Sequence, residues 1–265
     1  MLSVGWRWMF ITMGIVGIVL ALLIYQVYRN PAQVALSDAE HAYLGTGAQA
    51  AAGPISLRDW QALFRFRTTW GLILGYFGSI YILWLYNAWL PQYLQIQWHL
   101  TVARTGWVAA VPFLFGVVGS LLGGWICDRL LRKGFTPINS RKVPMVTALL
   151  GTALFTVLTA TAPNSTLAVS YIAVSMFLCY ISISSAWATA SVAAAANATA
   201  SLGSLQNFGG YLGGALAPTI TGIVVDRTGS FRPALFVGAL VAFSAALAFL
   251  VLVRGSVGVD SDAHR

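Results

Sequence analysis

The side chains able to recognise a small solute are uncharged and fall inside apolar segments. Ser184 and Trp187 are three residues apart and share one helical face with Tyr180 and Ser191. An indole ring stacks on the C–H faces of a sugar-like molecule, and hydroxyl groups bond its O–H groups. This stripe favours recognition of a polyhydroxy acid. Serines also help membrane helices to pack, which is sufficient to explain Ser191.

Asn207 places an amide near the middle of another apolar segment. An amide in lipid without a partner is costly, so the side chain should face protein or water. It either hydrogen-bonds a neighbouring helix or binds the hydroxyl or carboxylate oxygens of a solute, and the residue type leaves both open. Tyr76 and Asn87 add polar groups to a third apolar segment and are further candidates for the same binding site.

No charged residue lies deep within any apolar segment, and this limits the chemistry. The histidines, His41, His99 and His264, fall in loops or tails, and the two cysteines, Cys127 and Cys179, show neither a disulfide framework nor metal-ligand spacing. No nucleophile and base stand together, so we expect no enzyme activity, no metal and no cofactor. Proton relays and anion clamps also need intramembrane charges, and this chain has none of its own.

The composition is that of an integral membrane protein. Of the 265 residues, 58% are hydrophobic and 8% are charged, and the mean hydropathy is +0.77. A net charge of +8 can indicate nucleic-acid binding. Here the bases sit in loops that flank apolar segments, where they orient the protein in the membrane. We therefore expect a lipid bilayer as the surroundings and no nucleic acid as a partner.

Seven segments are long enough to cross a bilayer, which takes about 20 apolar residues. Backbone groups must satisfy one another in lipid, so each segment is expected to be a helix. The sequence thus predicts an all-α, polytopic membrane bundle of about seven transmembrane helices. The expected spans are residues 8–28, 69–90, 105–127, 143–162, 167–190, 201–225 and 233–253.

The basic residues predict how this bundle is oriented. If the loop between the first two spans is cytoplasmic, only four of the 15 Lys and Arg residues lie outside, namely Arg7, Arg104, Arg227 and Arg232. Basic residues concentrate on the cytoplasmic side of membrane proteins. The chain is expected in the plasma or inner membrane of the cell. Its central linker and C-terminal tail are expected on the cytoplasmic side. The N-terminus is expected outside.

The stretch between the first two spans, residues 29–68, is predicted to be a cytoplasmic linker. Residues 45–54 are rich in Gly and Ala, which is typical of a flexible linker. Ser56 and Asp59 then form an N-cap pair. The apolar face that follows predicts a short interfacial helix, and a plain extension of the next span explains the pattern equally well.

The densest charge in the chain follows the third span. The string from Gly123 to Gly134 ends an apolar run with Asp128, then Arg129 and further bases. This acid-then-base order resembles the cytoplasmic signature loop of the major facilitator superfamily of transporters. The resemblance implies that Gly124, Asp128 and Arg129 belong to a gating latch, with Asp128 capping or pairing with a neighbouring helix. A solvated loop that only sets topology is the alternative.

Two further strings resemble the anion:cation symporter branch of that superfamily. Residues 5–10, Gly-Trp-Arg-Trp-Met-Phe, are similar to the start of its sixth helix, and residues 201–218 are similar to its eleventh helix. A full member has two six-helix halves, and the pattern of the first five helices is absent from this chain. The resemblance divides the chain into a first helix (1–28), a central linker (29–68), a second transporter half (69–253) and a tail (254–265).

The resemblance implies transport of a small organic anion by proton-coupled alternating access. Members of the branch carry sugar acids such as galactonate and glucarate, hexuronates or tartrate. In relatives the Ser184–Trp187 pair and Asn207 contact the sugar acid, whereas some relatives have glutamine in place of Tyr76, which leaves the anion open. The branch keeps its coupling carboxylate and substrate-binding arginine in the first half, so the expected partner is a missing N-terminal half or a second copy. The alternative function is a truncated, non-transporting membrane remnant or scaffold.

Overall fold

The computed structural model describes residues 6–29, 37, 40, 56–195 and 198–258. The chain divides into two compact units, residues 1–51 and residues 52–265, which are treated separately below. The long helix of the first unit is α1 (Trp6–Val27), which has 22 residues. At 1.5 Å per residue it is about 33 Å long, enough to cross the hydrocarbon core of a membrane.

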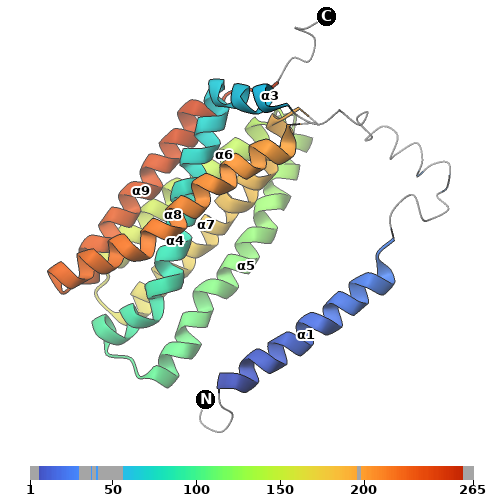
Figure 1. The fold of residues 1–265 in the computed structure, drawn as a ribbon. Coiled ribbons are helices and arrows are strands. Elements are labelled where there is room, and N and C mark those ends of the chain that lie inside the picture. The colour runs from blue at the N-terminus through green and yellow to red at the C-terminus, as the bar shows by residue number, and fades with distance from the viewer. Residues whose placement is uncertain (1–5, 30–36, 38–39, 41–55, 196–197, 259–265) are drawn as a thin grey trace, which may run out of the picture. The chain divides into compact units, whose positions relative to one another are not determined.

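The second unit is a bundle of six long helices, preceded by two short ones (Figure 1). Successive long helices run in opposite directions, so their connections gather at the two ends of the bundle. One end, with connections at 99–101, 161–164 and 229–230, is called the Arg232 end below; the other, with connections at 133–138 and 194–198, is called the Asp128 end. The elements are α3 (Leu57–Ala62), η2 (Leu63–Arg65), α4 (Arg67–Trp98), α5 (Val102–Arg132), α6 (Asn139–Ala160), α7 (Ser165–Ala193), α8 (Thr199–Thr228) and α9 (Phe231–Leu252).

The predicted all-α membrane fold is confirmed. Seven helices of the described chain are long and apolar enough to cross a membrane. Among the described residues the extended pairing is limited to one isolated bridge, between Ala194 and Val257. The predicted N-cap is also confirmed, because the Ser56 hydroxyl accepts the Asp59 N–H at 3.2 Å and the Asp59 carboxylate accepts the Ser56 N–H at 3.2 Å.

Two helices extend further than the hydropathy pattern predicts. Helix α4 continues through Pro91 to Trp98 and ends at His99, whose φ of 51° is left-handed. Helix α5 continues to Arg132, and Gly134, with a φ of 90°, follows its end. The prediction that Asp128 and Arg129 stand in a loop is therefore wrong in this respect. They belong to the last turns of α5, because charged side chains at a membrane surface do not interrupt the backbone hydrogen bonds of a helix.

Glycines allow the helices of the bundle to approach one another closely. A Cβ atom at Gly209 or Gly213 of α8 would collide with the carbonyl oxygens of Ile73 and Phe77 of α4. Gly119 of α5 lies in the same way against the backbone of α7. Helices in lipid gain little from hydrophobic burial, so such small-residue contacts, which increase van der Waals packing, hold them together.

A chain of hydroxyl groups crosses the core of the bundle. The Tyr86 hydroxyl of α4 donates to Thr156 Oγ1 of α6 at 3.0 Å, and Thr156 Oγ1 lies 3.1 Å from Ser175 Oγ of α7. All three side chains are buried. Because these side chains are buried, each hydroxyl needs a hydrogen-bond partner, and the chain of hydroxyls links three helices through such partners.

The segment after α9 crosses the Asp128 end of the bundle. The Val257 N–H donates to the Ala193 carbonyl at 2.5 Å, and the Val257 carbonyl accepts the Ala195 N–H at 3.1 Å. Thr68 Oγ1 at the start of α4 donates to the Gly255 carbonyl at 2.9 Å. We call residues 253–258 the strap, because they connect the ends of α4, α7 and α9.

Candidate functional site

The structure brings together predicted site residues from α4 and α7. The rings of Tyr76 and Trp187 meet edge to face, with centroids 6.1 Å apart and planes at 82°. Tyr76 is only 3% exposed, whereas Trp187 is 46% exposed. The buried phenol thus supports the indole from behind, and the other surface of the indole remains open to a ligand. Aromatic pairs of this geometry are attractive and orient both rings.

Helix α8 supplies the third side of this site. A Cβ atom at Gly210 would lie 2.6 Å from Tyr76 Cδ1, so the Tyr76 ring fits only against a glycine. A Cβ atom at Gly203 would lie 3.9 Å from the Trp187 ring. Asn207 stands one helical turn from each of these glycines and therefore shares their face of α8. The site accordingly consists of Tyr76, Trp187 and Asn207, one from each helix.

The amide of Asn207 has no hydrogen-bond partner within the described residues. The side chain is half-buried, but neither its amide oxygen nor its amide nitrogen is fully shielded from solvent. Of the two interpretations drawn from the sequence, the interhelical hydrogen bond is not formed among the residues that the structure describes. An amide with free donors and acceptor is what binding to the oxygens of a solute requires.

Ser184 lies one turn from Trp187, on the side of α7 that contacts α5. A Cβ atom at Gly123 would lie 3.1 Å from Ser184 Cβ, and the serine is half-buried. Its neighbour Ser185 differs, because that hydroxyl is buried and donates to the Ile181 carbonyl at 2.8 Å. Ser184 therefore has a hydroxyl available near the Trp187 ring, and Ser185 uses its own hydroxyl within the protein.

Asn87 is separated from this group. It lies eleven residues after Tyr76 on α4, which is three turns and about 16 Å along the helix, on the same face. Its side chain is exposed. One small ligand that touches Trp187 does not reach it, so the structure does not bring Asn87 together with the central group.

The three residues of the predicted latch lie near the end of α5. Arg129 stacks over the Trp125 ring, with Cζ 5.3 Å from its centroid. The Asp128 side chain is exposed and has no ion-pair partner within the described residues. A Cβ atom at Gly124 would meet nothing within 4 Å, although Gly123 beside it is packed against α7. The face of α5 that carries Gly124 is thus open in this bundle.

One polar residue next to the site was missed by sequence reasoning. Gln206 is fully buried, and neither its Oε1 nor its Nε2 has a partner within the described residues. It precedes Asn207 and, together with Gly209 and Gly213, faces α4. The available signal was a polar residue in the middle of a span. Gln206 and Asn207 both carry an amide, and residue type alone does not tell which of them is buried. A buried amide without partners lowers the stability of the bundle, because the hydrogen bonds that it makes with water in the unfolded chain are not replaced.

Comparison with known proteins fixes the family. A profile described as Major Facilitator Superfamily matches residues 1–218 and, again, residues 72–263. The fold resembles a crystal structure of the fucose:proton symporter FucP (N162A) of Escherichia coli, with a TM-score of 0.65 and 18% identity, covering 92% of this chain and 54% of that one.

Curated relatives agree with this assignment. The probable L-galactonate transporter of Escherichia coli (strain K12) is 44% identical over 255 residues, which cover 96% of this chain and 56% of the relative. The D-galactonate transporter of Escherichia coli O6:H1 (strain CFT073) is 32% identical over 94% of this chain and 60% of the relative. This chain thus spans little more than half the length of these relatives. By profile, by sequence and by fold, the chain belongs to the Major Facilitator Superfamily and is an integral membrane protein.

Proposed function

We propose that this chain forms one half of a sugar-acid transporter that works by proton-coupled alternating access. The observation that carries the proposal is the convergence of Tyr76, Trp187 and Asn207 from three helices. Relatives named as transporters of L-galactonate and D-galactonate support a hexonate, a six-carbon polyhydroxy carboxylate, as the substrate. Another relative, 30% identical, is named as a probable galactarate/D-glucarate transporter of Bacillus subtilis. The dicarboxylates galactarate and glucarate are therefore the next candidate substrates.

In this proposal each side chain has its own part in binding. The Trp187 indole covers the C–H face of the sugar chain, and the Tyr76 ring holds the indole in place. The Asn207 amide donates to and accepts from substrate hydroxyls, and the Ser184 hydroxyl adds a further bond. Because polar groups in a closed site are left unpaired when a substrate hydroxyl is missing, such an arrangement discriminates strongly against deoxygenated analogues.

The negative charge of the substrate needs a partner from outside this bundle. The described acidic and basic residues of α4–α9 stand near helix ends and not at mid-span. The cation that meets the carboxylate and the group that carries the proton are therefore proposed to come from a partner, either an N-terminal half or a second copy of this chain.

The open face of α5 is proposed to meet that partner. Gly124 leaves space for close approach by another helix, and Asp128 and Arg129 at the end of the same helix are placed to latch it. Rocking of one half against the other around a central site then gives alternating access. In the proposed orientation the Asp128 end is cytoplasmic and the Arg232 end is outside, as the distribution of bases indicates.

Uptake in proteoliposomes tests this function. The purified chain is reconstituted alone and together with the N-terminal half of the 44% identical relative, and labelled L-galactonate and D-galactonate are supplied under an inward proton gradient. Uptake that depends on the added half and on the gradient is expected. Absence of uptake of all sugar acids in both preparations, with correctly inserted protein, contradicts the proposal.

A further inference from the structure

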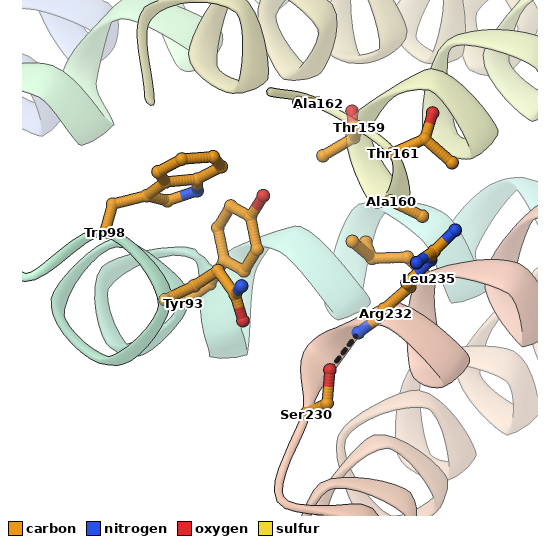
Figure 2. A pocket seen from close by; sticks show the side chains of 10 residues that line it. Tyr93, Trp98, Thr159, Ala160, Thr161, Ala162, Ser230, Arg232 and Leu235 are labelled. Atoms are coloured by element: carbon orange, nitrogen blue, oxygen red, sulfur yellow. Dashed lines mark hydrogen bonds between the residues drawn. The ribbon is translucent and has the colours of Figure 1, made fainter. Parts of the chain in front are cut away.

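A cavity of about 370 Å³ opens at the Arg232 end of the bundle, away from the site described above. Figure 2 shows Tyr93 and Trp98 from the end of α4 on one side, Arg232 and Leu235 from the start of α9 on another, and the end of α6 above them. Tyr93 lies 17 residues after Tyr76, so the cavity is about 25 Å along α4 from the sugar-acid site. One ligand does not occupy both places.

The lining of this cavity is polar and carries a single charge. Arg232 is its cation, and none of the described residues around it is acidic. Tyr93, Gln97 and Ser230 add further polar groups. A guanidinium without a carboxylate in a polar cavity favours an oxyanion as the ligand.

The outer surface of α9 leads directly to this cavity. The Arg232 guanidinium lies 5.9 Å from the centroid of the Phe236 ring one turn away, and Phe236 is exposed. Leu240, Phe243 and Leu247 continue the exposed apolar stripe along the same face of α9. Acyl chains lying along this stripe end at Arg232, at the level where a tryptophan marks the membrane interface.

We propose that the cavity binds the phosphate of an anionic phospholipid, with its acyl chains against the exposed stripe of α9. The Arg232 guanidinium bonds the phosphate oxygens. A choline headgroup is disfavoured because none of the described lining residues offers a negative charge to its ammonium. The site therefore distinguishes phosphatidylglycerol from phosphatidylcholine.

Native mass spectrometry of the purified, delipidated full chain tests the proposal. The protein is titrated with phosphatidylglycerol, with phosphatidylcholine and with phosphatidylglycerol in the presence of inorganic phosphate. Arg232→Gln is expected to weaken phosphatidylglycerol binding about tenfold, the effect of one lost charged hydrogen bond. Arg227→Gln is the matched control, because Arg227 is exposed at the same end of the bundle but does not line the cavity.

Each result decides the proposal. Preferential binding of phosphatidylglycerol that is lost in Arg232→Gln and kept in Arg227→Gln supports it. Equal binding by wild type and Arg232→Gln, or an equal loss in both variants, overturns it. Displacement of the lipid by millimolar phosphate overturns the proposal that the ligand is a phospholipid and assigns the cavity to a free oxyanion. If Arg232→Gln does not fold, Leu240→Glu decides: it puts a charge on the exposed stripe of α9 where the acyl chains are proposed to lie, and unchanged lipid binding overturns the proposal.

Discussion

Tyr76 and Trp187 meet edge to face at 6.1 Å, and their exposures are opposite: the phenol is 3% exposed and the indole is 46% exposed. This contact joins α4 to α7, and Asn207 of α8 stands one helical turn from the glycines that lie against the two rings. A buried ring that fixes an accessible one keeps the indole in one orientation, so less side-chain freedom is lost when a substrate binds.

Removal of the indole tests that arrangement. Trp187→Ala is expected to lower kcat/KM for sugar-acid uptake by about tenfold or more, equivalent to roughly 1.4 kcal/mol, because the stacking surface is lost. The fold should tolerate the change, since nearly half of the side chain is exposed. Trp107→Ala is the control, because Trp107 is 84% exposed on α5 and outside the site. Equal uptake by the two variants would remove Trp187 from the binding surface.

Glycine replacements separate packing inside the bundle from the open face of α5. Gly213→Ala places a methyl group against the Phe77 carbonyl and should lower the free energy of unfolding by about 1–3 kcal/mol. Gly124→Ala meets nothing within 4 Å and should leave it unchanged or slightly raised. Thermal unfolding in detergent measures both. A lower melting temperature for Gly124→Ala than for Gly213→Ala would show that the helix contacts are wrongly assigned.

The hydroxyl chain across α4, α6 and α7 predicts an order of stabilities. Thr156→Val leaves the buried Tyr86 hydroxyl without its acceptor and should cost about 1–3 kcal/mol. Tyr86→Phe removes the donor and leaves Thr156 bonded to the Thr152 carbonyl and to Ser175, so it should cost about 1 kcal/mol. Chemical denaturation measures both values, and the reverse order would contradict this hydrogen-bond pattern.

The strap predicts a local effect at the Asp128 end. Val257→Pro removes the N–H that donates to the Ala193 carbonyl, and the amide of Ala195 should then exchange about fivefold faster, which corresponds to roughly 1 kcal/mol. Gly258→Pro is the control, because Gly258 is exposed and none of the described backbone hydrogen bonds uses its N–H. Hydrogen exchange read by mass spectrometry gives the rates. Unchanged exchange in Val257→Pro would show that the strap does not hold this connection.

The number and type of the helices follow from the sequence because bilayer thickness requires long apolar runs. The residues at which the helices end cannot be read from the hydropathy. Hydropathy falls where a helix leaves the lipid, whereas the backbone hydrogen bonds of the helix continue beyond that point. This is why α4 continues past Pro91 and why Asp128 and Arg129 are helical.

The site was predictable in part. Spacing places Ser184 and Trp187 on one face of a helix, but it does not say which helix faces them. The contact between Trp187 and Tyr76 depends on glycines such as Gly210 that let α8 and α4 approach. Burial of Gln206 depends on the same approach, so it could not be read from the residue alone.

Substitution of Asn207 shows whether its amide binds the sugar acid. Labelled L-galactonate uptake is measured for wild type and Asn207→Ala, each reconstituted with the complementary half and normalised to inserted protein. Asn207→Ala is expected to lose uptake and to keep its melting temperature, since the amide has no partner among the described residues. Normal uptake by Asn207→Ala would contradict this expectation.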